Sequence, residues 1–362
     1  MIRILQCVNT MDRAGLETML MNYYRNIDRN QIQFDFLTHR PTAGEYDEEI
    51  RQLGGHIYHA PRLYPQNYPA YFKWMRNFFA EHPEYKIVHS HIDAMSYLPL
   101  LAAKKNNIPI RIAHSHSTSI DKDIKYMLKQ CYRRGLNRVA THRFACGEKA
   151  GEFLFRDCDF QVIPNAVNAS DFCFNAQKRA DKRRELGLTD EFTIGHVGRF
   201  YYPKNHKFLI DIFYALIRLR ADARLVLIGK GEKESEIRDY VAKLGLTDRV
   251  HFLGSRSDTS DLYQAMDVFV LPSLFEGIPL VGVEAQMADL PCFFSDAVPK
   301  EVMFSDKVQF MPLSQPVQQW AEQIVAVDQT RNSHRECISN SPYDIKNAHE
   351  KLVDRYLRLI DE

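Results

Sequence analysis

Short apolar runs alternate with amphipathic segments along most of this chain, and this alternation limits the folds that the chain can adopt. The apolar runs have strand length, and the segments between them repeat apolar residues at helical spacing. The expected strands of the first half are 2–8, 34–37, 57–59, 87–90, 110–113 and 143–146, with helices at 16–23, 71–79, 95–104 and 124–138. The second half repeats the pattern, with strands at 192–197, 224–228, 250–253 and 268–271 and helices at 208–219, 234–244 and 260–266. Such alternation predicts an α/β fold with two successive Rossmann-like halves, each a parallel sheet covered by helices on both faces.

The length supports a division into two domains. A chain of 362 residues is too long for one ordinary core, so two domains of ~150 to 180 residues are expected. We place the first at 1–170 and the second at 185–344, and we interpret the polar run 175–184 as a linker or a mobile helix start. The last amphipathic segment, 345–362, is expected to pack back on the first domain.

Composition and charge exclude several classes of protein. The balance of 45% hydrophobic and 26% charged residues is that of a soluble globular protein, and a net charge of +1 does not favour nucleic acid as a partner. The seven cysteines form no Cys-x-x-Cys pair, so neither a disulfide framework nor a zinc site is indicated. With no signal-peptide pattern and no apolar run of the ~20 residues that span a bilayer, a cytoplasmic location is expected.

One segment combines two carboxylates with a turn that is suited to ligand binding. The sequence SLFEGIPLVGVEAQ, residues 273–286, joins the apolar run 268–271 to a helix-compatible stretch. Glu276 and Glu284 stand eight residues apart, and Gly277 and Pro279 shape the turn between them. Open α/β sheets bind ligands at such strand-to-helix junctions. The alternative is that Glu276 is an acid favoured by the helix dipole and that Glu284 is a solvated helix residue.

Several short motifs occur in a fixed order along the chain. They are AGLE at 14–17, PNAV at 164–167, HVGR at 196–199 with Lys204, LVLIGKG at 225–231, VHFLG at 250–254, FVLPS at 269–273 and EGIPLVGVEA at 276–285. Together they resemble glycosyltransferase family 4, a family of retaining enzymes of the GT-B fold. The resemblance covers nearly the whole chain and is strongest from residue 190 to residue 302. It implies two Rossmann-like domains that face each other across a cleft, with the donor bound mainly by the second domain and the cleft closing on it.

Two positions depart from the family pattern. Ala14 replaces one of two glycines in the first loop, and Ala166 replaces the glycine after Pro-Asn. A Cβ atom is tolerated only where φ is negative or where no ligand atom presses on the backbone. We therefore expect a diphosphate to approach Gly15 rather than Ala14.

The resemblance implies a role for each candidate residue. Breaking the anomeric bond of a sugar nucleotide leaves negative charge on the diphosphate, and Arg199 and Lys204 can stabilise it as fixed cations. The sequence shows no Asp-x-Asp metal pair in a suitable loop, so we expect no metal and no other cofactor. Glu284 is expected to accept hydrogen bonds from the ribose, and Glu276 to meet the hexose. Arg199, Lys204 and Glu276 are thus catalytic candidates, and on the alternative interpretation the two cations lie on the surface. The other donor-binding candidates here are Gly15, Gly198, Gly229, Gly254, Ser255, Arg256, Gly277, Ile278, Pro279 and Leu280, with the base near residues 254–256.

Three histidines stand at strand ends of the first half. His91 lies in VHSHIDA, and His114 and His116 lie in IAHSHST. The family places a histidine in this region near the donor sugar, so His116 is our catalytic candidate, and His91 and His114 are assigned to donor binding. Such a histidine could donate to a hexose hydroxyl or help to stabilise positive charge through its backbone carbonyl. The alternatives are local loop hydrogen bonds or a metal site, and the latter lacks a convergent carboxylate or cysteine.

A basic stretch at 122–143 is a candidate contact surface for an anionic partner. Residues 101–150 hold eleven Lys or Arg against three Asp or Glu. This stretch is interpreted either as a solvated helix face or as a contact with anionic lipid or a lipid diphosphate at the inner face of the membrane.

The expected function combines these roles. The family resemblance implies a retaining glycosyltransferase that moves a hexose or N-acetylhexosamine from a nucleotide-diphosphate sugar, most simply a UDP-sugar. The acceptor would be a glycan or a polyprenyl-diphosphate-linked sugar, in surface polysaccharide biosynthesis such as that of exopolysaccharide or capsule. Because no acidic residue in the first-half loops stands out as a nucleophile, we expect an oxocarbenium-like transition state. The alternatives are an epimerase or hydrolase on the same fold and a sugar-nucleotide-binding protein without turnover.

Overall fold

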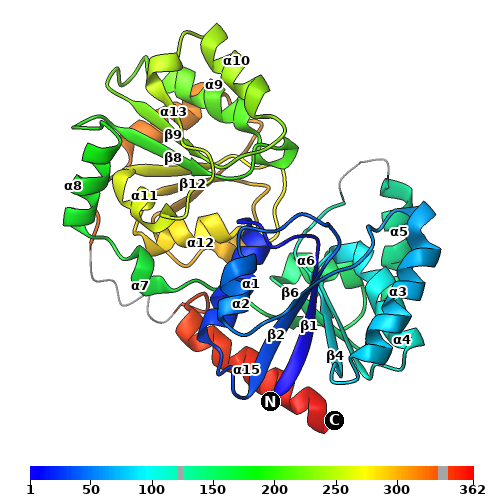
Figure 1. The fold of residues 1–362 in the computed structure, drawn as a ribbon. Coiled ribbons are helices and arrows are strands. Elements are labelled where there is room, and N and C mark those ends of the chain that lie inside the picture. The colour runs from blue at the N-terminus through cyan, green and yellow to red at the C-terminus, as the bar shows by residue number, and fades with distance from the viewer. Residues whose placement is uncertain (121–124, 333–340) are drawn as a thin grey trace. The chain divides into compact units, whose positions relative to one another are not determined.

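The computed structural model describes residues 1–120, 125–332 and 341–362, and it divides the chain into two compact units. Unit 1 comprises Met1–Ala166 and Ile345–Glu362, and unit 2 comprises Val167–Asp344 (Figure 1). The last helix therefore belongs to the same unit as the first strands.

Unit 1 is built on a parallel sheet of seven strands. Their order is β3-β2-β1-β4-β5-β6-β7, so the sheet grows outward in both directions from the pair β1 and β4. Most of these strands are buried on both faces, which explains why they read as apolar runs. Their bounds are β1 (Ile2–Val8), β2 (Ile32–Thr38), β3 (Ile57–His59), β4 (Ile87–Ser90), β5 (Ile110–Ser115), β6 (His142–Ala145) and β7 (Gln161–Val162).

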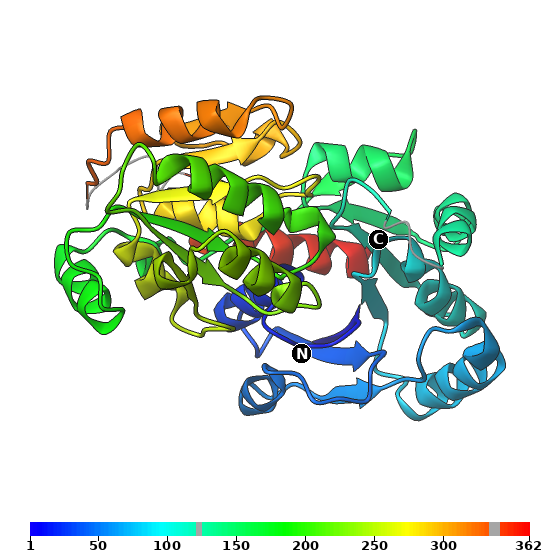
Figure 2. The same ribbon diagram turned by 90° about the horizontal axis from the view of Figure 1, so that it is seen from above.

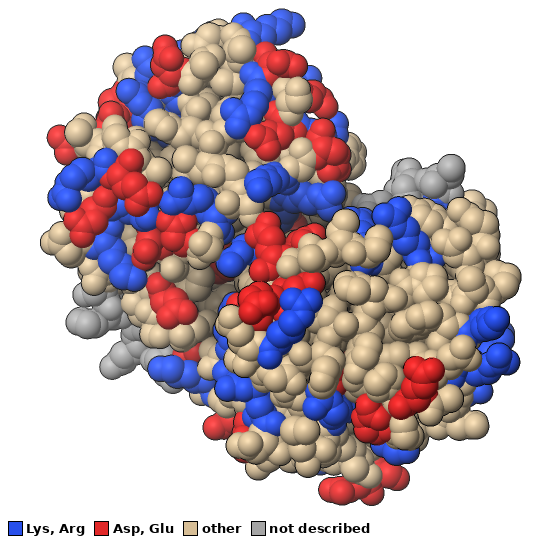
Figure 3. All heavy atoms as spheres, viewed as in Figure 1, with Lys and Arg blue, Asp and Glu red and all other residues tan. Residues whose placement is uncertain are grey.

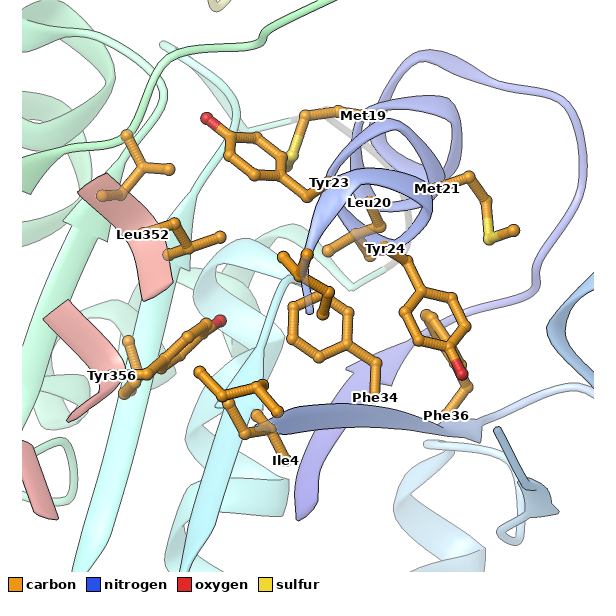
Figure 4. Packing of buried hydrophobic residues seen from close by; sticks show 14 of the residues in the cluster. Ile4, Met19, Leu20, Met21, Tyr23, Tyr24, Phe34, Phe36, Leu352 and Tyr356 are labelled. Atoms are coloured by element: carbon orange, nitrogen blue, oxygen red, sulfur yellow. The ribbon is translucent and has the colours of Figure 1, made fainter. Parts of the chain in front are cut away.

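Helices cover both faces of this sheet, over two separate apolar cores. Residues of β1 alternate between the cores, so that Ile4 packs into one and Leu5 into the other. Figure 4 shows the first core, where Tyr23 of the first helix and Phe34 of β2 lie near Tyr356 of the last helix. The last helix thus completes the core of unit 1 (Figures 1 and 2). The helices are α1 (Gly15–Asn26), α2 (Asp47–Gln52), α3 (Tyr68–Glu81), α4 (Tyr97–Lys105), α5 (Tyr126–Leu136), α6 (Glu148–Phe155) and α15 (Ile345–Asp361).

Unit 2 repeats the architecture with six parallel strands in the order β10-β9-β8-β11-β12-β13. Its core gathers apolar residues of the central strands and of the helices on one face. The strands are β8 (Thr193–Val197), β9 (Arg224–Ile228), β10 (Val250–Phe252), β11 (Val268–Leu271), β12 (Cys292–Ser295) and β13 (Val308–Met311). The helices are α7 (Ala169–Phe172), α8 (Ala176–Glu185), α9 (His206–Leu216), α10 (Glu234–Lys243), α11 (Thr259–Ala265), α12 (Leu280–Met287) and α13 (Val317–Ala326).

The polar run 175–184 is not a linker. It forms α8, which begins where the Asn175 side chain accepts a hydrogen bond from the backbone N–H of Lys178. Arg179 pairs with Asp267 at 2.5 Å, which ties this helix to the start of β11. Residues 167–170, which we expected in the first domain, also belong to unit 2, because α7 packs against α11 and α12. The basic helix expected at 124–138 begins at Tyr126, and residue 124 lies outside the described residues.

Candidate active site

The strand order places the candidate loops at two topological switch points. In unit 2 the order reverses between β8 and β11, whose carboxyl ends lead into residues 198–204 and 272–279. In unit 1 it reverses between β1 and β4, which lead into the loop before Gly15 and into His91. Ligands of open α/β sheets bind beside these ends. In each unit by itself, the candidate residues therefore lie where such a fold binds a ligand.

Lys204 and Glu276 meet directly. Lys204 ends a short 3-10 turn (Tyr202–Lys204), and its Nζ donates to Glu276 Oε1 at 2.6 Å. The Ser273 hydroxyl donates to the same oxygen at 2.7 Å. Both charged side chains are only 12% exposed, so this ion pair is largely withdrawn from water. The structure thus joins two residues that stand 72 positions apart.

Arg199 has a different partner, which the sequence analysis missed. Its guanidinium lies 3.2 Å from the Glu232 carboxylate, and both side chains are more than half exposed. Exposed ion pairs of this kind contribute little, about 0 to 1 kcal/mol. The Arg199 guanidinium can therefore exchange Glu232 for a more highly charged anionic ligand at small cost.

The backbone around Arg199 depends on two glycines. Gly229 has a φ of +136°, and a Cβ atom there would lie 2.2 Å from the carbonyl oxygen of Gly198. Gly229 also donates its N–H to the carbonyl of Gly254 at 2.8 Å. The ends of β8, β9 and β10 are thus held together by close backbone contacts that a side chain would disrupt.

Glu284 is buried and is not a solvated helix residue. It lies in α12 with 6% of its surface exposed, and the Tyr263 hydroxyl donates to its Oε2 at 2.9 Å. Burial raises the pKa of Glu284 to about 7, and the hydrogen bond from Tyr263 acts in the opposite direction. The carboxyl therefore changes its charge near neutral pH.

The turn before α12 and the loop after β10 complete the unit 2 candidates. Gly277, Ile278, Pro279 and Leu280 are buried, and Pro279 immediately precedes the helix. After β10, Gly254 has a φ of +66°. Beyond Ser255, the Arg256 side chain donates to the carboxylates of Asp258 and Glu185, which hold the pKa of Arg256 above its usual value. Arg256 therefore binds α8 in this structure, which leaves the backbone of 254–255 as the expected contact for a base.

The first loop of unit 1 accommodates its alanine without strain. Ala14 has φ −131° and ψ 172°, an extended conformation that any residue adopts. Gly15 begins α1, and no atom lies within 4 Å of the position that its Cβ would take. The space beside Gly15 is open, as an approaching ligand would require.

Four histidines stand together at the carboxyl ends of β4 and β5. Nδ1 of His91 lies 3.0 Å from Nε2 of His116, and Nε2 of His89 lies 3.1 Å from Nδ1 of His114. His91 and His114 are at most 2% exposed, so their side chains do not reach solvent, whereas His116 is half-buried. The sequence analysis missed His89, although it lies two residues before His91 and therefore on the same face of the chain.

Asp93 supports this cluster from the neighbouring loop. Its φ of +46° is unusual for a residue with a side chain, and its Oδ1 accepts a hydrogen bond from the backbone N–H of His116 at 2.8 Å. The sequence contains no clear signal for this contact, because it depends on the pairing of β4 with β5.

The histidine cluster does not fit a metal ion as it stands. His89, His91 and His114 each offer a nitrogen within 4.8 Å of the others, the one such group in the described part of the chain. Both ring nitrogens of His89 and of His91 already have hydrogen-bond partners. Only Nε2 of His114 has none. A metal would have to break this network to gain its ligands.

Charges of both signs are mixed over the surface that Figure 3 shows, in keeping with the net charge of +1. This face carries no continuous basic surface of the kind that binds nucleic acid. Among the described helices, none has the length and apolar character that crossing a membrane requires.

Comparison with known proteins identifies the class. Two parallel-sheet α/β units with ligand loops at their switch points form the architecture of GT-B glycosyltransferases. The Anabaena protein Alr3699/HepE, solved in complex with UDP-glucose, superposes with a TM-score of 0.82 at 18% identity over 99% of this chain and 100% of that chain. Sucrose-phosphate synthase from Thermosynechococcus elongatus superposes with a TM-score of 0.79 at 16% identity over 100% of both chains.

Sequence relatives give the family. Residues 13–171 match glycosyltransferase family 4, and residues 191–328 match the family described as glycosyl transferases group 1. EpsF of Bacillus subtilis (strain 168), which is named as a glycosyltransferase, is 36% identical over 94% of this chain and 91% of its own length. An Escherichia coli UDP-Gal:alpha-D-GlcNAc-diphosphoundecaprenol alpha-1,3-galactosyltransferase is 30% identical over 59% of this chain and 58% of its own length. This chain belongs to glycosyltransferase family 4.

Proposed function

We propose that this protein is a retaining, metal-independent glycosyltransferase that transfers a hexose or N-acetylhexosamine from a UDP-sugar. The acceptor is a glycan or a polyprenyl-diphosphate-linked sugar, and the pathway is surface polysaccharide biosynthesis. The observation that carries the proposal is the convergence of Lys204, Glu276 and Arg199 on the switch point of unit 2, with Glu284 buried nearby in α12. The UDP-glucose complex of the Anabaena protein and the lipid-linked acceptor of the Escherichia coli relative support the choice of donor and acceptor.

In the proposed mechanism, the bond from the anomeric carbon to the diphosphate oxygen breaks first. Arg199 and Lys204 stabilise the charge that develops on the diphosphate, each by on the order of 2 to 4 kcal/mol. The acceptor oxygen then bonds to the anomeric carbon from the same face, and the departing phosphate oxygen takes the acceptor proton. Configuration is retained without a covalent enzyme intermediate. A product whose anomeric configuration is inverted, as measured by NMR, would exclude this mechanism.

The basic helix α5 is proposed to contact an anionic membrane surface. Lys129, Arg133 and Arg134 lie on this helix, and Met127, seven residues before Arg134 and therefore on the same helix face, is 72% exposed. A cationic helix with an exposed apolar residue suits a surface of anionic lipid headgroups. The contact would bring a lipid-linked acceptor to unit 1.

A panel of nucleotide sugars tests the proposed function. We expect UDP-sugars to raise the melting temperature more than GDP-, ADP- or CMP-sugars, and one of them to be transferred, as followed by mass spectrometry. Acceptors are supplied as polyprenyl-diphosphate-linked sugars in anionic vesicles or in neutral detergent, and faster transfer in the vesicles is expected. Stabilisation by UDP-sugars without transfer to any acceptor would favour a binding protein, and hydrolysis alone would favour a hydrolase. Equal rates in vesicles and detergent would remove the membrane contact from the proposal.

The charge state of Glu284 predicts how nucleotide binding depends on pH. An ionised carboxylate accepts hydrogen bonds from ribose hydroxyls at both oxygens, and protonation removes part of that capacity. Because the pKa of Glu284 is raised to about 7, the ionised fraction falls as the pH decreases from 8 to 6. We expect UDP affinity to fall over this range, by at most about tenfold, the change in the ionised fraction.

Glu284→Gln provides the control for this pH profile. The variant should bind UDP more weakly at pH 8, and it should lack the part of the pH dependence that belongs to Glu284. UDP titrates in the same range, so calorimetric affinities are compared as the ratio of wild type to variant at each pH. If the ratio of the two affinities did not change between pH 6 and pH 8, the result would show that Glu284 does not bind the ribose.

A further inference from the structure

Two chains of hydrogen bonds run through the histidine cluster and meet at Gln6 of β1. Gln6 Oε1 lies 2.8 Å from Nε2 of His91, whose Nδ1 contacts His116. Gln6 Nε2 donates to the Tyr356 hydroxyl at 3.4 Å, and that hydroxyl lies 2.6 Å from Nδ1 of His89. Gln6, His89, His91 and Tyr356 are at most 2% exposed. Water therefore does not compete for these hydrogen bonds.

The chemistry of Gln6 gives the first chain a direction. The amide oxygen only accepts, so His91 must carry its proton on Nε2 and accept at Nδ1. His116 must then donate from Nε2 to His91. A neutral imidazole holds one N–H, so Nδ1 of His116 is left unprotonated. Among the described residues, the hydrogen bonds of His116 are made by Nε2 and by the backbone N–H, not by this nitrogen.

The second chain has the same direction. The Tyr356 oxygen that accepts from Gln6 still carries its own proton, and Nδ1 of His89 at 2.6 Å can accept it. With this direction, Nε2 of His89 donates to Nδ1 of His114, whose proton then lies on Nε2, a buried atom without a hydrogen-bond partner among the described residues. All four rings thus carry the proton on Nε2. Turning the Gln6 amide over would reverse both chains at once, so the four tautomers are coupled through one side chain.

All four rings stay neutral around physiological pH. Burial lowers the pKa of His116 to about 3 and the pKa values of His89, His91 and His114 well below their usual value. A charged histidine would donate from both nitrogens and disrupt the chains.

We propose that Gln6 is a positioning residue that holds all four histidines in the Nε2–H form, so that His116 presents Nδ1 as a hydrogen-bond acceptor for a sugar hydroxyl. The ligand part of this proposal rests on the proposed glycosyltransferase function, whereas the tautomers do not. It reverses the role that we expected for the His116 side chain, which was to donate. Because Nδ1 of His116 accepts a hydrogen bond in this proposal, the site should favour a sugar whose hydroxyl can donate to this atom over an analogue that lacks this hydroxyl.

Histidine tautomers can be read directly by NMR. Full-length protein labelled with ¹⁵N-histidine is recorded in long-range ¹H–¹⁵N spectra between pH 6 and pH 8, with resonances assigned by single histidine substitutions. We expect the Nε2–H pattern for His89, His91, His114 and His116 throughout this range. An Nδ1–H pattern on His116, or different tautomers among the four rings, would overturn the proposal.

Three variants separate the role of Gln6 from general packing. Gln6→Met keeps the volume but removes both hydrogen-bonding groups, so His91 and His116 should become tautomeric mixtures. Gln33→Met is the matched control, because Gln33 is also buried in unit 1 but donates to Leu53 instead. In Tyr356→Phe, His91 and His116 should keep the Nε2–H form, since only the second chain is cut. An unchanged spectrum for Gln6→Met would show that Gln6 does not hold the tautomers.

Kinetics test the ligand part. With the UDP-sugar that the donor panel identifies, Gln6→Met should raise the donor KM or lower kcat/KM by about tenfold, the size of one hydrogen bond to the substrate. Gln33→Met should stay within about twofold of wild type on the same scale. If the NMR spectra changed as expected but Gln6→Met and Gln33→Met had equal KM and kcat/KM values, the contact between His116 and the sugar would be refuted. If no nucleotide sugar is turned over, the proposed function fails, and the spectra alone decide the role of Gln6.

Discussion

Replacing Lys204 with methionine is expected to lower kcat by about 10²- to 10³-fold, the effect of removing one preorganised donor from a developing negative charge. Methionine keeps most of the length of the side chain but has no charge. The Lys204 side chain is only 12% exposed, and its ammonium pairs with Glu276 at 2.6 Å, so we expect it to be ordered before a ligand binds. The loss should therefore fall on kcat as well as on UDP binding, and steady-state kinetics with calorimetry would measure both.

Two further variants show whether Lys204 acts on the ligand or only on Glu276. Lys207→Met removes an exposed cation three residues further along, whose ammonium lies over the Tyr240 ring, and it should change kcat by less than about twofold. The double variant Lys204→Met, Glu276→Gln also removes the negative charge that the single variant leaves without its lysine. If the double variant recovered wild-type kcat, Lys204 would serve only to neutralise Glu276. Melting temperatures of all three variants exclude a folding defect as the cause.

The two ion pairs are compatible with a candidate site that is stable without a ligand and that can accept the diphosphate of the proposed donor. Lys204 and Arg199 are each matched by one carboxylate, Glu276 and Glu232. A diphosphate brings more negative charge than either carboxylate and can draw the exposed Arg199 away from Glu232 at little cost. Lys204 is less free to move, because Glu276 is also held by Ser273. If the proposed function is correct, we expect Arg199 to change partner when the diphosphate binds and Lys204 to stay in place.

The sequence predicted most of the fold because the signals were local. Strands β1, β4, β9 and β11 have the expected bounds, since each is a short apolar run between turn residues. The strands β12 and β13 were missed, because the sequence analysis placed no strand after residue 271. The segment of α8 was interpreted as a linker or a mobile helix start because its apolar content is low, and ion pairs such as Arg179 with Asp267 hold the helix in place.

The candidate site was predicted as a set of residues but not as a set of contacts. The order of motifs pointed to Lys204 and Glu276, yet their direct pairing depends on β8 lying next to β11. The burial of Glu284 and its contact with Tyr263 depend on how α12 packs, which spacing along the chain does not show. Gln6 carried no signal at all, because a lone glutamine in an apolar strand gains meaning only from the histidines beside it.

Replacing Gly229 with alanine is expected to abolish UDP binding and to lower the melting temperature by several degrees. The φ of +136° is accessible almost only to glycine, and the new Cβ would lie 2.2 Å from the Gly198 carbonyl oxygen. Backbone atoms cannot rotate away as a flexible side chain can, so the Gly198–Arg199 peptide must move. Arg199 would then leave the position from which it reaches a diphosphate.

Gly245→Ala separates this clash from the cost of a positive φ alone. Gly245 has a φ of +70°, and no atom lies within 4 Å of its Cβ position. Its replacement should cost about 1 to 2 kcal/mol of stability, which corresponds to a few degrees, and should leave UDP affinity unchanged. Calorimetric titration with UDP and thermal unfolding of both variants provide the comparison. If Gly229→Ala bound UDP as tightly as Gly245→Ala, the position of Arg199 would not depend on the Gly198 backbone, and its part in holding the diphosphate would have to be reassigned.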